Sequence, residues 1–184
     1  SRSRVLRYSP PFQNNMAADL VLGQPVFTSS APGGGAAGLG LPQGIAIDES
    51  GSVWVSERFN MRILRYDAPF SNGKAASLVL GHPNLDAFQH NNNFPPPSNT
   101  NVKYPAGMSF DSLGRLWVAD SGHDRVIRFD PPFSNGMSLS VSLGAPRFSS
   151  LYVQSQTSLI SPSDVSVDAS GNIWVAAGVG RVLE

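Results

Sequence analysis

The feature that most constrains the fold is an internal repeat of about 60 residues. Residues 4–23 (RVLRYSPPFQNNMAADLVLG) recur as residues 62–81 (RILRYDAPFSNGKAASLVLG) and as residues 125–144 (RVIRFDPPFSNGMSLSVSLG), and a fourth copy begins at Arg181. A fixed period of this size is typical of a chain that stacks one supersecondary unit several times. The repeat therefore has to be explained before any single element is assigned.

The second half of each unit predicts a pair of strands joined by a tight turn. It reads GIAIDESGSVWVSE at residues 44–57, GMSFDSLGRLWVAD at residues 107–120 and DVSVDASGNIWVAA at residues 164–177. Apolar and polar residues alternate in its first strand, and a glycine stands where a hairpin turn needs a positive φ angle. One tryptophan occupies the same place in each second strand, which favours a core position. These tryptophans are Trp54, Trp117 and Trp174.

The first half of each unit predicts two further strands. One is the Arg-Val-Leu-Arg-Tyr type of segment, and the other is the Leu-Val-Leu-Gly type of segment that follows a turn containing Pro-Phe. No segment shows helical periodicity over a useful length. The sequence therefore predicts an all-β fold, a β-propeller whose blades are four-stranded antiparallel sheets.

One motif of the unit carries a family resemblance. It is best seen in the second copy, at Pro105, Gly107, Asp111, Gly114, Trp117, Val118, Asp120 and Arg125. This pattern resembles the NHL repeat, a resemblance that implies a six-bladed propeller and a fold that hosts binding modules, scaffolds and a few enzymes. The third copy departs from it, because Asp164 and Ala177 stand where the second copy has Gly107 and Asp120.

Three such blades would make half of a closed ring. The predicted domain is a single propeller half over residues 1–184, with repeats at about 4–61, 62–124 and 125–184. The end blades would expose apolar sheet faces, which mark association surfaces. We therefore expect a homodimer in which the strands at residues 4–8 and 19–22 of one copy complete the last blade of the other. The alternative is that the sequence is a piece of a longer propeller.

The loops between the second and third strands are the candidate binding site. They are expected to surround the mouth of the central channel, where they would meet a protein or small-molecule ligand. The alternative is that Glu57 and Asp120 pair with Arg62 and Arg125, or with turn amides, and so hold the hairpins. The candidate residues are Glu57, Arg58, Phe59, Asn60, Asp120, His123 and Asp124.

No catalytic residue, metal site or cofactor is predicted. His82, His90 and His123 lack the spacing of metal ligands, and the chain has no cysteine. An aspartate recurs before each inner turn, at Asp48, Asp111 and Asp168, where accepting turn amides explains it better than catalysis does. The positions expected at the axis are Gln43, Ala106 and Ser163, which are poor ligands for hard cations.

Composition narrows the classes of partner. The formal net charge is zero, so no basic field would attract nucleic acid. No apolar stretch approaches the roughly 20 residues of a membrane-spanning helix. The function predicted from the sequence is a non-catalytic binding or assembly scaffold, with a metal-dependent propeller lyase or hydrolase as the alternative. The localisation stays open, although the composition suits an exported or cell-envelope protein of a bacterium.

Overall fold

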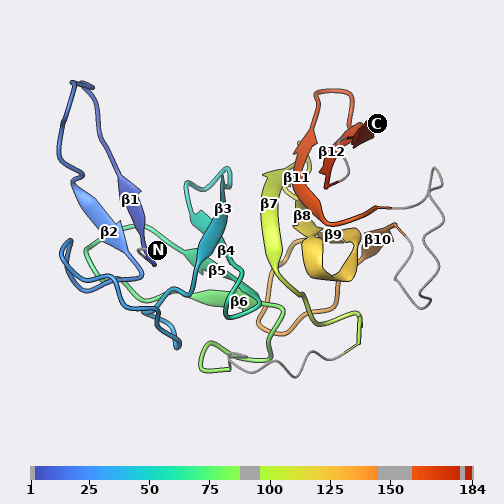
Figure 1. Cartoon of the computed structure of the whole chain (residues 1–184), viewed down its shortest axis with the longest axis horizontal. Coiled ribbons are helices and arrows are strands. Elements are labelled where there is room, and N and C mark those ends of the chain that lie inside the picture. Colours follow the sequence, from blue (N-terminus) through green and yellow to red (C-terminus); the bar gives the residue numbers. More distant parts are fainter. Residues whose placement is uncertain (1–2, 88–95, 145–158, 179–180, 184) are drawn as a thin grey trace.

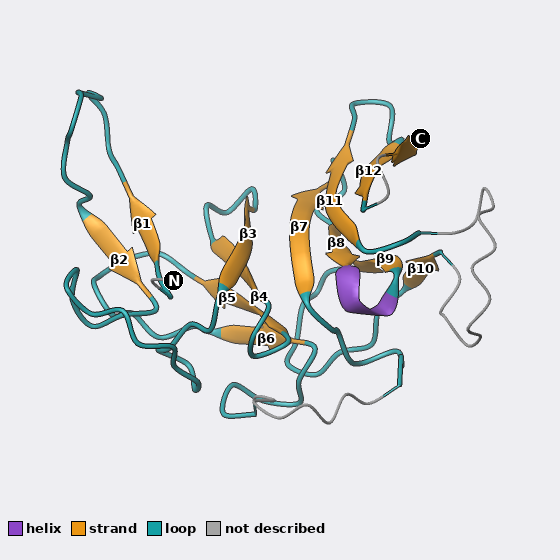
Figure 2. Ribbon diagram, in the orientation of Figure 1, coloured by secondary structure: helices purple, strands orange, loops and turns teal. Residues whose placement is uncertain are grey.

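The computed structural model describes residues 3–87, 96–144, 159–178 and 181–183, and these form antiparallel sheets that follow one another along the chain (Figures 1 and 2). The first sheet pairs β1 (Val5–Arg7) with β2 (Leu20–Leu22). The first four-stranded sheet has the order β3 (Pro42–Ile47), β4 (Val53–Glu57), β5 (Arg62–Tyr66), β6 (Leu78–Leu80).

The second four-stranded sheet repeats this order with β7 (Pro105–Phe110), β8 (Leu116–Asp120), β9 (Arg125–Phe129) and β10 (Val141–Leu143). The last sheet joins β11 (Pro162–Val167), β12 (Ile173–Ala177) and β13 (Arg181–Leu183). A single turn of 3-10 helix, η1 (Ser121–His123), lies between β8 and β9. The expected all-β fold with four-stranded antiparallel sheets is confirmed.

The first strands of successive sheets lie side by side. β3 contacts β7, and β7 contacts β11, so these strands form a row from which the rest of each sheet extends outward (Figure 1). This is the arrangement of propeller blades about an axis, with β3, β7 and β11 innermost. The two-stranded sheet β1–β2 lies at one side of the row and the sheet β11–β13 at the other.

Each inner hairpin is held by its recurring aspartate, as the sequence predicts. Asp111 accepts hydrogen bonds from the backbone amides of Leu113 and Arg115, at 3.0 and 3.1 Å, while Gly114 takes a φ angle of 69°. Its second carboxylate oxygen accepts the indole N–H of Trp117 at 2.9 Å. The same three kinds of contact recur around Asp48 and Asp168. The aspartate therefore fixes both the turn and the tryptophan six residues later.

The tryptophans form the seams between neighbouring sheets. Trp54 is fully buried and meets the rings of Phe110 and Phe133 edge-on, with centroids 5.7 and 4.8 Å apart, and both phenylalanines belong to the next sheet. Trp117 belongs to one buried cluster with Val165 of β11. Edge-on aromatic pairs add about 0.5–1.5 kcal/mol to the gain from burial. The predicted core position of the tryptophans holds for these two seams.

The two ends of the row leave apolar side chains exposed. Ile45 and Ile47 of β3 are 53% and 63% exposed, and Trp174 of β12 is 39% exposed. Ile45 and Ile47 correspond to Met108 and Phe110, which pack in the seam behind Trp54. The end faces are thus built like the inner seams, but Ile45, Ile47 and Trp174 stay exposed in the described chain. The sheet β1–β2 packs on the outer strands of the sheet β3–β6, through residues of β4, β5 and β6.

The strand pairing corrects one expectation about the last blade. The inner pair β11–β12 was expected to lack its own outer pair, although a further copy of the third-strand segment begins at Arg181. In the structure Arg181–Leu183 forms β13 and pairs with β12 through Arg181 and Ala177. It takes the position that the predicted dimer assigned to residues 4–8 of a second copy. The described chain therefore holds two complete four-stranded blades, with the third set divided between a pair of strands at the start and three strands at the end.

Candidate functional site

A buried ion pair holds the first candidate loop. The side chains of Glu57 and Arg62 are both fully buried, and Arg62 Nε donates to Glu57 Oε2 at 2.5 Å. The other carboxylate oxygen accepts the backbone amide of Gly40 at 2.5 Å and the side-chain amide of Asn60 at 2.8 Å. Arg62 also donates to three backbone carbonyls, those of Gly35, Gly38 and Leu85.

The second loop contains a matching network around Asp120. Its Oδ2 accepts Nε of Arg125 at 2.7 Å and lies 2.9 Å from Nδ1 of His123. Its Oδ1 accepts the backbone amide of Lys103 at 2.6 Å. The neighbouring Asp124 accepts the backbone amide of Ser161 at 2.8 Å, which ties the loop to the connection that precedes β11.

These networks place most of the predicted site residues inside the protein. Glu57, Asn60, Asp120, His123 and Asp124 are buried, whereas Arg58 is exposed and Phe59 is half-buried. Burial raises the pKa of Glu57, against the opposing effect of Arg62. The pairing of Glu57 and Asp120 with Arg62 and Arg125, the alternative drawn from the sequence, is what the structure shows.

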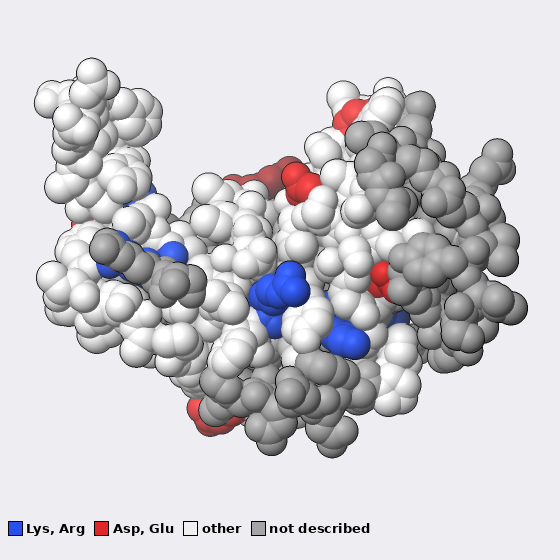
Figure 3. Space-filling model, viewed as in Figure 1, with Lys and Arg blue, Asp and Glu red and all other residues white. Residues whose placement is uncertain are grey.

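A cationic cluster that the sequence did not reveal lies beside these loops. The guanidinium of Arg58 stands 4.7 Å from the ring centroid of Tyr104, and the amine of Lys103 stands 5.8 Å from it. Figure 3 shows Lys and Arg side chains around the lower end of β7, on the face that carries the inner strands. Nothing in the repeat pattern marks Tyr104, because it lies in the connection that varies between copies.

The inner strands also border a shallow, polar groove. Its volume is about 470 Å³, and it is lined by Gln43, Gly44, Ile45, Ala106, Gly107, Met108, Ser109, Ser163, Asp164, Val165 and Ser166. All three inner strands carry a register irregularity here, between Pro42 and Ile45 and at the equivalent places. The predicted axial positions Gln43, Ala106 and Ser163 therefore line one surface.

A tight contact crosses this groove at Gly107. A Cβ atom at that position would lie only 1.8 Å from Oδ1 of Asp164, so the glycine provides the space that the aspartate fills. The third copy has Asp164 where the second copy has Gly107. Asp164 fits because β7, the preceding inner strand, has no side chain at the facing position.

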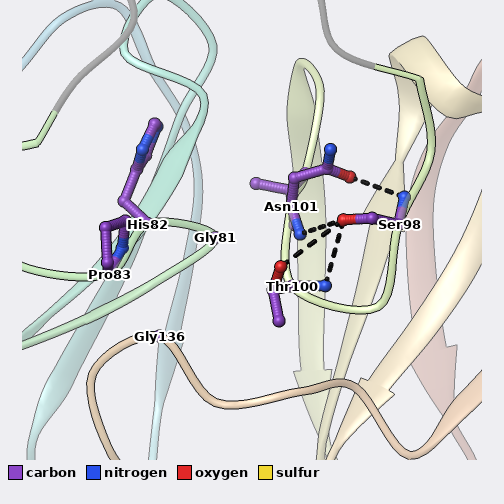
Figure 4. A pocket seen from close by; sticks show the side chains of 8 residues that line it. Gly81, His82, Pro83, Ser98, Thr100, Asn101 and Gly136 are labelled. Atoms are coloured by element: carbon purple, nitrogen blue, oxygen red, sulfur yellow. Dashed lines mark hydrogen bonds between the residues drawn. The ribbon is translucent and has the colours of Figure 1, made fainter.

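A second pocket lies between the two complete sheets, away from the inner strands. It has a volume of about 450 Å³ and is lined by His82, Pro83, Ser98, Thr100 and Asn101, together with Gly81, Val102 and Gly136. In Figure 4, Ser98, Thr100 and Asn101 form one wall and bond to one another, while His82 and Pro83 form the other. Its polar groups largely satisfy each other.

The histidines are held by neighbouring backbone and side-chain groups. His82 contacts the carbonyl of Asn60 at 3.1 Å, and burial lowers its pKa. His123 is the ring beside Asp120, and His90 lies outside the described residues. Over the described part of the chain, no group of three or more His, Cys, Asp or Glu side chains lies close enough to hold a metal ion. Nor does any helix in that part have the length and apolarity needed to cross a membrane.

The chain was also compared with known proteins. Two solved structures that resemble it are virginiamycin B lyase from Staphylococcus aureus (TM-score 0.47) and a streptogramin B lyase (TM-score 0.44), each 15% identical in sequence. The alignments cover 77% and 74% of this chain but 36% and 34% of those proteins, so the chain spans about a third of their length.

A comparison with curated proteins gave no match. Residues 103–129, which run from the connection before β7 to the end of β9, match the model of the NHL repeat. This segment contains the motif from which the resemblance was drawn. The match identifies residues 103–129 as an NHL repeat, and the four-stranded antiparallel sheets arranged about the inner strands are those of a propeller-like fold.

Proposed function

We propose that the chain is a non-catalytic scaffold that pairs with a second copy to close a six-bladed ring. The ring would present the channel-mouth loops of both copies around one axis. Arg58 and Phe59 are the candidate residues whose side chains reach the surface, so a protein or small-molecule ligand would contact these two. The buried candidates, Glu57, Asn60, Asp120, His123 and Asp124, would hold the loops in position.

The observation that carries this proposal is the exposure of equivalent residues along the row. The tryptophan exposures are 0% for Trp54, 6% for Trp117 and 39% for Trp174. The residues of the inner strands show the reverse trend: Met108 of the sheet β7–β10 is 7% exposed, whereas its counterpart Ile45 of the sheet β3–β6 is 53% exposed. One end thus offers the tryptophan half of a seam and the other end offers the aliphatic half.

These two halves are complementary in a second copy. If Trp174 of one copy meets Ile45 and Ile47 of another, the new contact repeats the seam that Trp54 already makes with the following sheet. A two-fold axis then generates two identical seams and closes the ring. Burial of apolar area contributes about 25 cal/mol per Å², so covering the exposed side chains at both ends would favour association.

Closure requires two equivalent exchanges of strands, one at the last blade of each copy. β1 of the second copy would take the place of β13 on β12, and the two segments begin with the same residues, Arg-Val-Leu at positions 4–6 and 181–183. The incoming strand would therefore bring the same side chains to the edge of β12. The attached β2 would supply the fourth strand of that blade.

The mass in solution tests the proposal. We expect light scattering to give twice the chain mass of 19.6 kDa, and Ile47→Asp to return the protein to a single chain. Leu113→Asp is the matched control. Leu113 is 66% exposed, but it lies in the turn between β7 and β8, away from both exposed end faces. A single-chain mass for the unaltered protein would refute the assembly.

Metal analysis separates this proposal from a metal-dependent lyase or hydrolase. A scaffold should purify without stoichiometric zinc or calcium and should not gain thermal stability when either ion is added. One bound ion per chain or per ring, retained through dialysis, would favour the enzyme and contradict a purely structural role.

A further inference from the structure

The turn of each outer hairpin holds the edge of the preceding sheet. Asn72, in the turn between β5 and β6, accepts the backbone amide of Val21 on β2 at 3.0 Å, and Gly73 donates to the carbonyl of Val21 at 3.1 Å. One blade further on, Asn135 accepts the backbone amide of Val79 on β6 at 2.9 Å. The asparagine thus pairs with the middle residue of the neighbouring fourth strand.

This contact covers strands that would otherwise be open edges. β2 and β6 are the outermost strands of their sheets, and every residue of both is buried. Edge strands present unpaired N–H and C=O groups that natural proteins cover in some way. Here the cover is the asparagine turn of the next blade, which also brings Phe133 onto Trp54.

Among the described residues, one fourth strand and one outer turn remain without this contact. β10 is the outermost strand of the middle sheet, its central residue Ser142 is exposed, and within the described residues no asparagine lies against it. The turn between β1 and β2 carries Asn14 at the position of Asn72 and Asn135, and Asn14 is exposed. Its conformation already matches, because Asn15 has a φ angle of 60° where Gly73 and Gly136 have 69° and 68°.

We infer that the Asn14 turn of one copy clamps Ser142 on β10 of a second copy. The side-chain oxygen of Asn14 accepts the backbone amide of Ser142, as Asn72 and Asn135 do for Val21 and Val79. Phe12, which is 73% exposed in the single chain, takes the role of Phe133 in the seam that this turn forms with the second copy. The inference rests on the proposed assembly. It names the contact that would fix how the two copies are oriented in the ring, because the clamp joins a turn only to the fourth strand of the preceding blade.

The absence of cysteine makes the contact testable by cross-linking. Two chains are prepared, one with Asn14→Cys and the other with Ser142→Cys, and they are mixed and oxidised under mild conditions. A disulfide-linked pair should form in the mixture and not in either chain alone, because each chain alone brings no two cysteines together.

Two further pairs calibrate the experiment. Val21→Cys with Asn72→Cys in one chain reproduces the same contact internally and should lose its free thiols on oxidation without any covalent link between chains. Asn14→Cys mixed with Ser112→Cys is the negative control, since Ser112 lies in the exposed turn between β7 and β8. Cross-linking of Asn14→Cys with Ser142→Cys above this background supports the clamp.

A second measurement avoids disulfide geometry. Asn14→Leu keeps the shape and removes the acceptor, while Ser142→Pro removes the donor from an edge position that tolerates proline. Each should weaken dimerisation about tenfold, and the double variant should be no weaker than either single one. A dimer that neither cross-links nor responds to these changes overturns the clamp and leaves the assembly standing, whereas a monomeric unaltered chain overturns both.

Discussion

At the scale of single residues, one aspartate in each inner hairpin stabilises the turn and also holds the tryptophan of the following strand. The sequence predicted the turn contacts of Asp48, Asp111 and Asp168, since an aspartate before a tight turn can accept the amides that follow it. It did not predict the bond to the indole of the tryptophan six residues later. That bond depends on the pairing of two strands, which brings the positions together only after the hairpin has formed.

These carboxylates predict acid sensitivity. Side-chain bonds from Asn172 and Trp174 lower the pKa of Asp168 to about 2, and the pKa of Asp111 is also lowered, because hydrogen bonds from Trp117 and Arg115 outweigh the effect of burial. A pKa that is lower in the folded state than in the unfolded chain gives stability above the unfolded value of 3.8, and this stability is lost as the pH falls. The urea midpoint should therefore drop between pH 4 and about pH 2. An unchanged midpoint over that range would contradict these roles.

The buried pair of Glu57 and Arg62 predicts a large cost for removing one partner. Arg62→Met leaves an unpaired buried carboxylate and should lower the free energy of unfolding by about 3–5 kcal/mol. Arg7→Met is the matched control, because Arg7 pairs with Asp19 at a surface where both side chains are more than a third exposed, and it should cost about 0–1 kcal/mol. Urea unfolding measures both losses, provided that the free energy of unfolding depends on urea concentration with the same slope in each variant. Equal losses would show that Glu57 is not held by Arg62.

At the scale of elements, the strands were predictable because alternation, turn residues and the repeat agree. The inner hairpins, the segments at residues 62–66 and 125–129, and the short fourth strands all form where the sequence places them. The contact between Asn135 and Val79 was not predicted, although an asparagine at the same place in each outer turn was a visible signal. Turn chemistry alone explains such an asparagine, so its reach to another blade is apparent only in the structure.

The seam between blades predicts different effects for two equivalent phenylalanines. Phe133 packs on Trp54, so Phe133→Ala should lower the free energy of unfolding by about 1–3 kcal/mol. Phe12→Ala changes a residue that is 73% exposed, and it should have little effect in dilute solution where the chain is single. Denaturation followed by tryptophan fluorescence compares the two. A large effect of Phe12→Ala at the same dilution would show that this hairpin packs within its own chain.

At the scale of the whole molecule, the channel-mouth loops show what a sequence leaves undetermined. The repeat predicted that Glu57, Asp120 and His123 lie in loops beside the axis, whereas in the structure Glu57 ends β4, Asp120 ends β8 and His123 lies in η1. It could not say that these side chains turn inward, because that depends on Arg62 and Arg125 reaching them from the next strand. Arg58 and Tyr104 meet for a similar reason, since they come from neighbouring blades.

The proposed ring makes stability depend on protein concentration. If two chains close one ring, the thermal midpoint should rise with concentration, because unfolding then separates two chains. Ile47→Asp should remove this dependence, and Leu113→Asp should keep it. A midpoint that stays constant over a hundredfold range of concentration in the unaltered protein would argue against a ring of two copies.

The irregularity shared by β3, β7 and β11 has a consequence for recognition. An irregularity leaves a residue of a strand without its ladder partner. Here a side chain takes that place, because the hydroxyl of Ser56 accepts the backbone amide of Gly44 at 2.8 Å and donates to the carbonyl of Ala106 at 2.7 Å. A molecule seated in the groove would therefore meet these three irregular strand segments, with Ser56 competing for the peptide groups of the first two. Ser56→Ala would release both peptide groups and so change what the groove offers, whereas exchange of Gln43 or Ser163 would change only the side chains that line it.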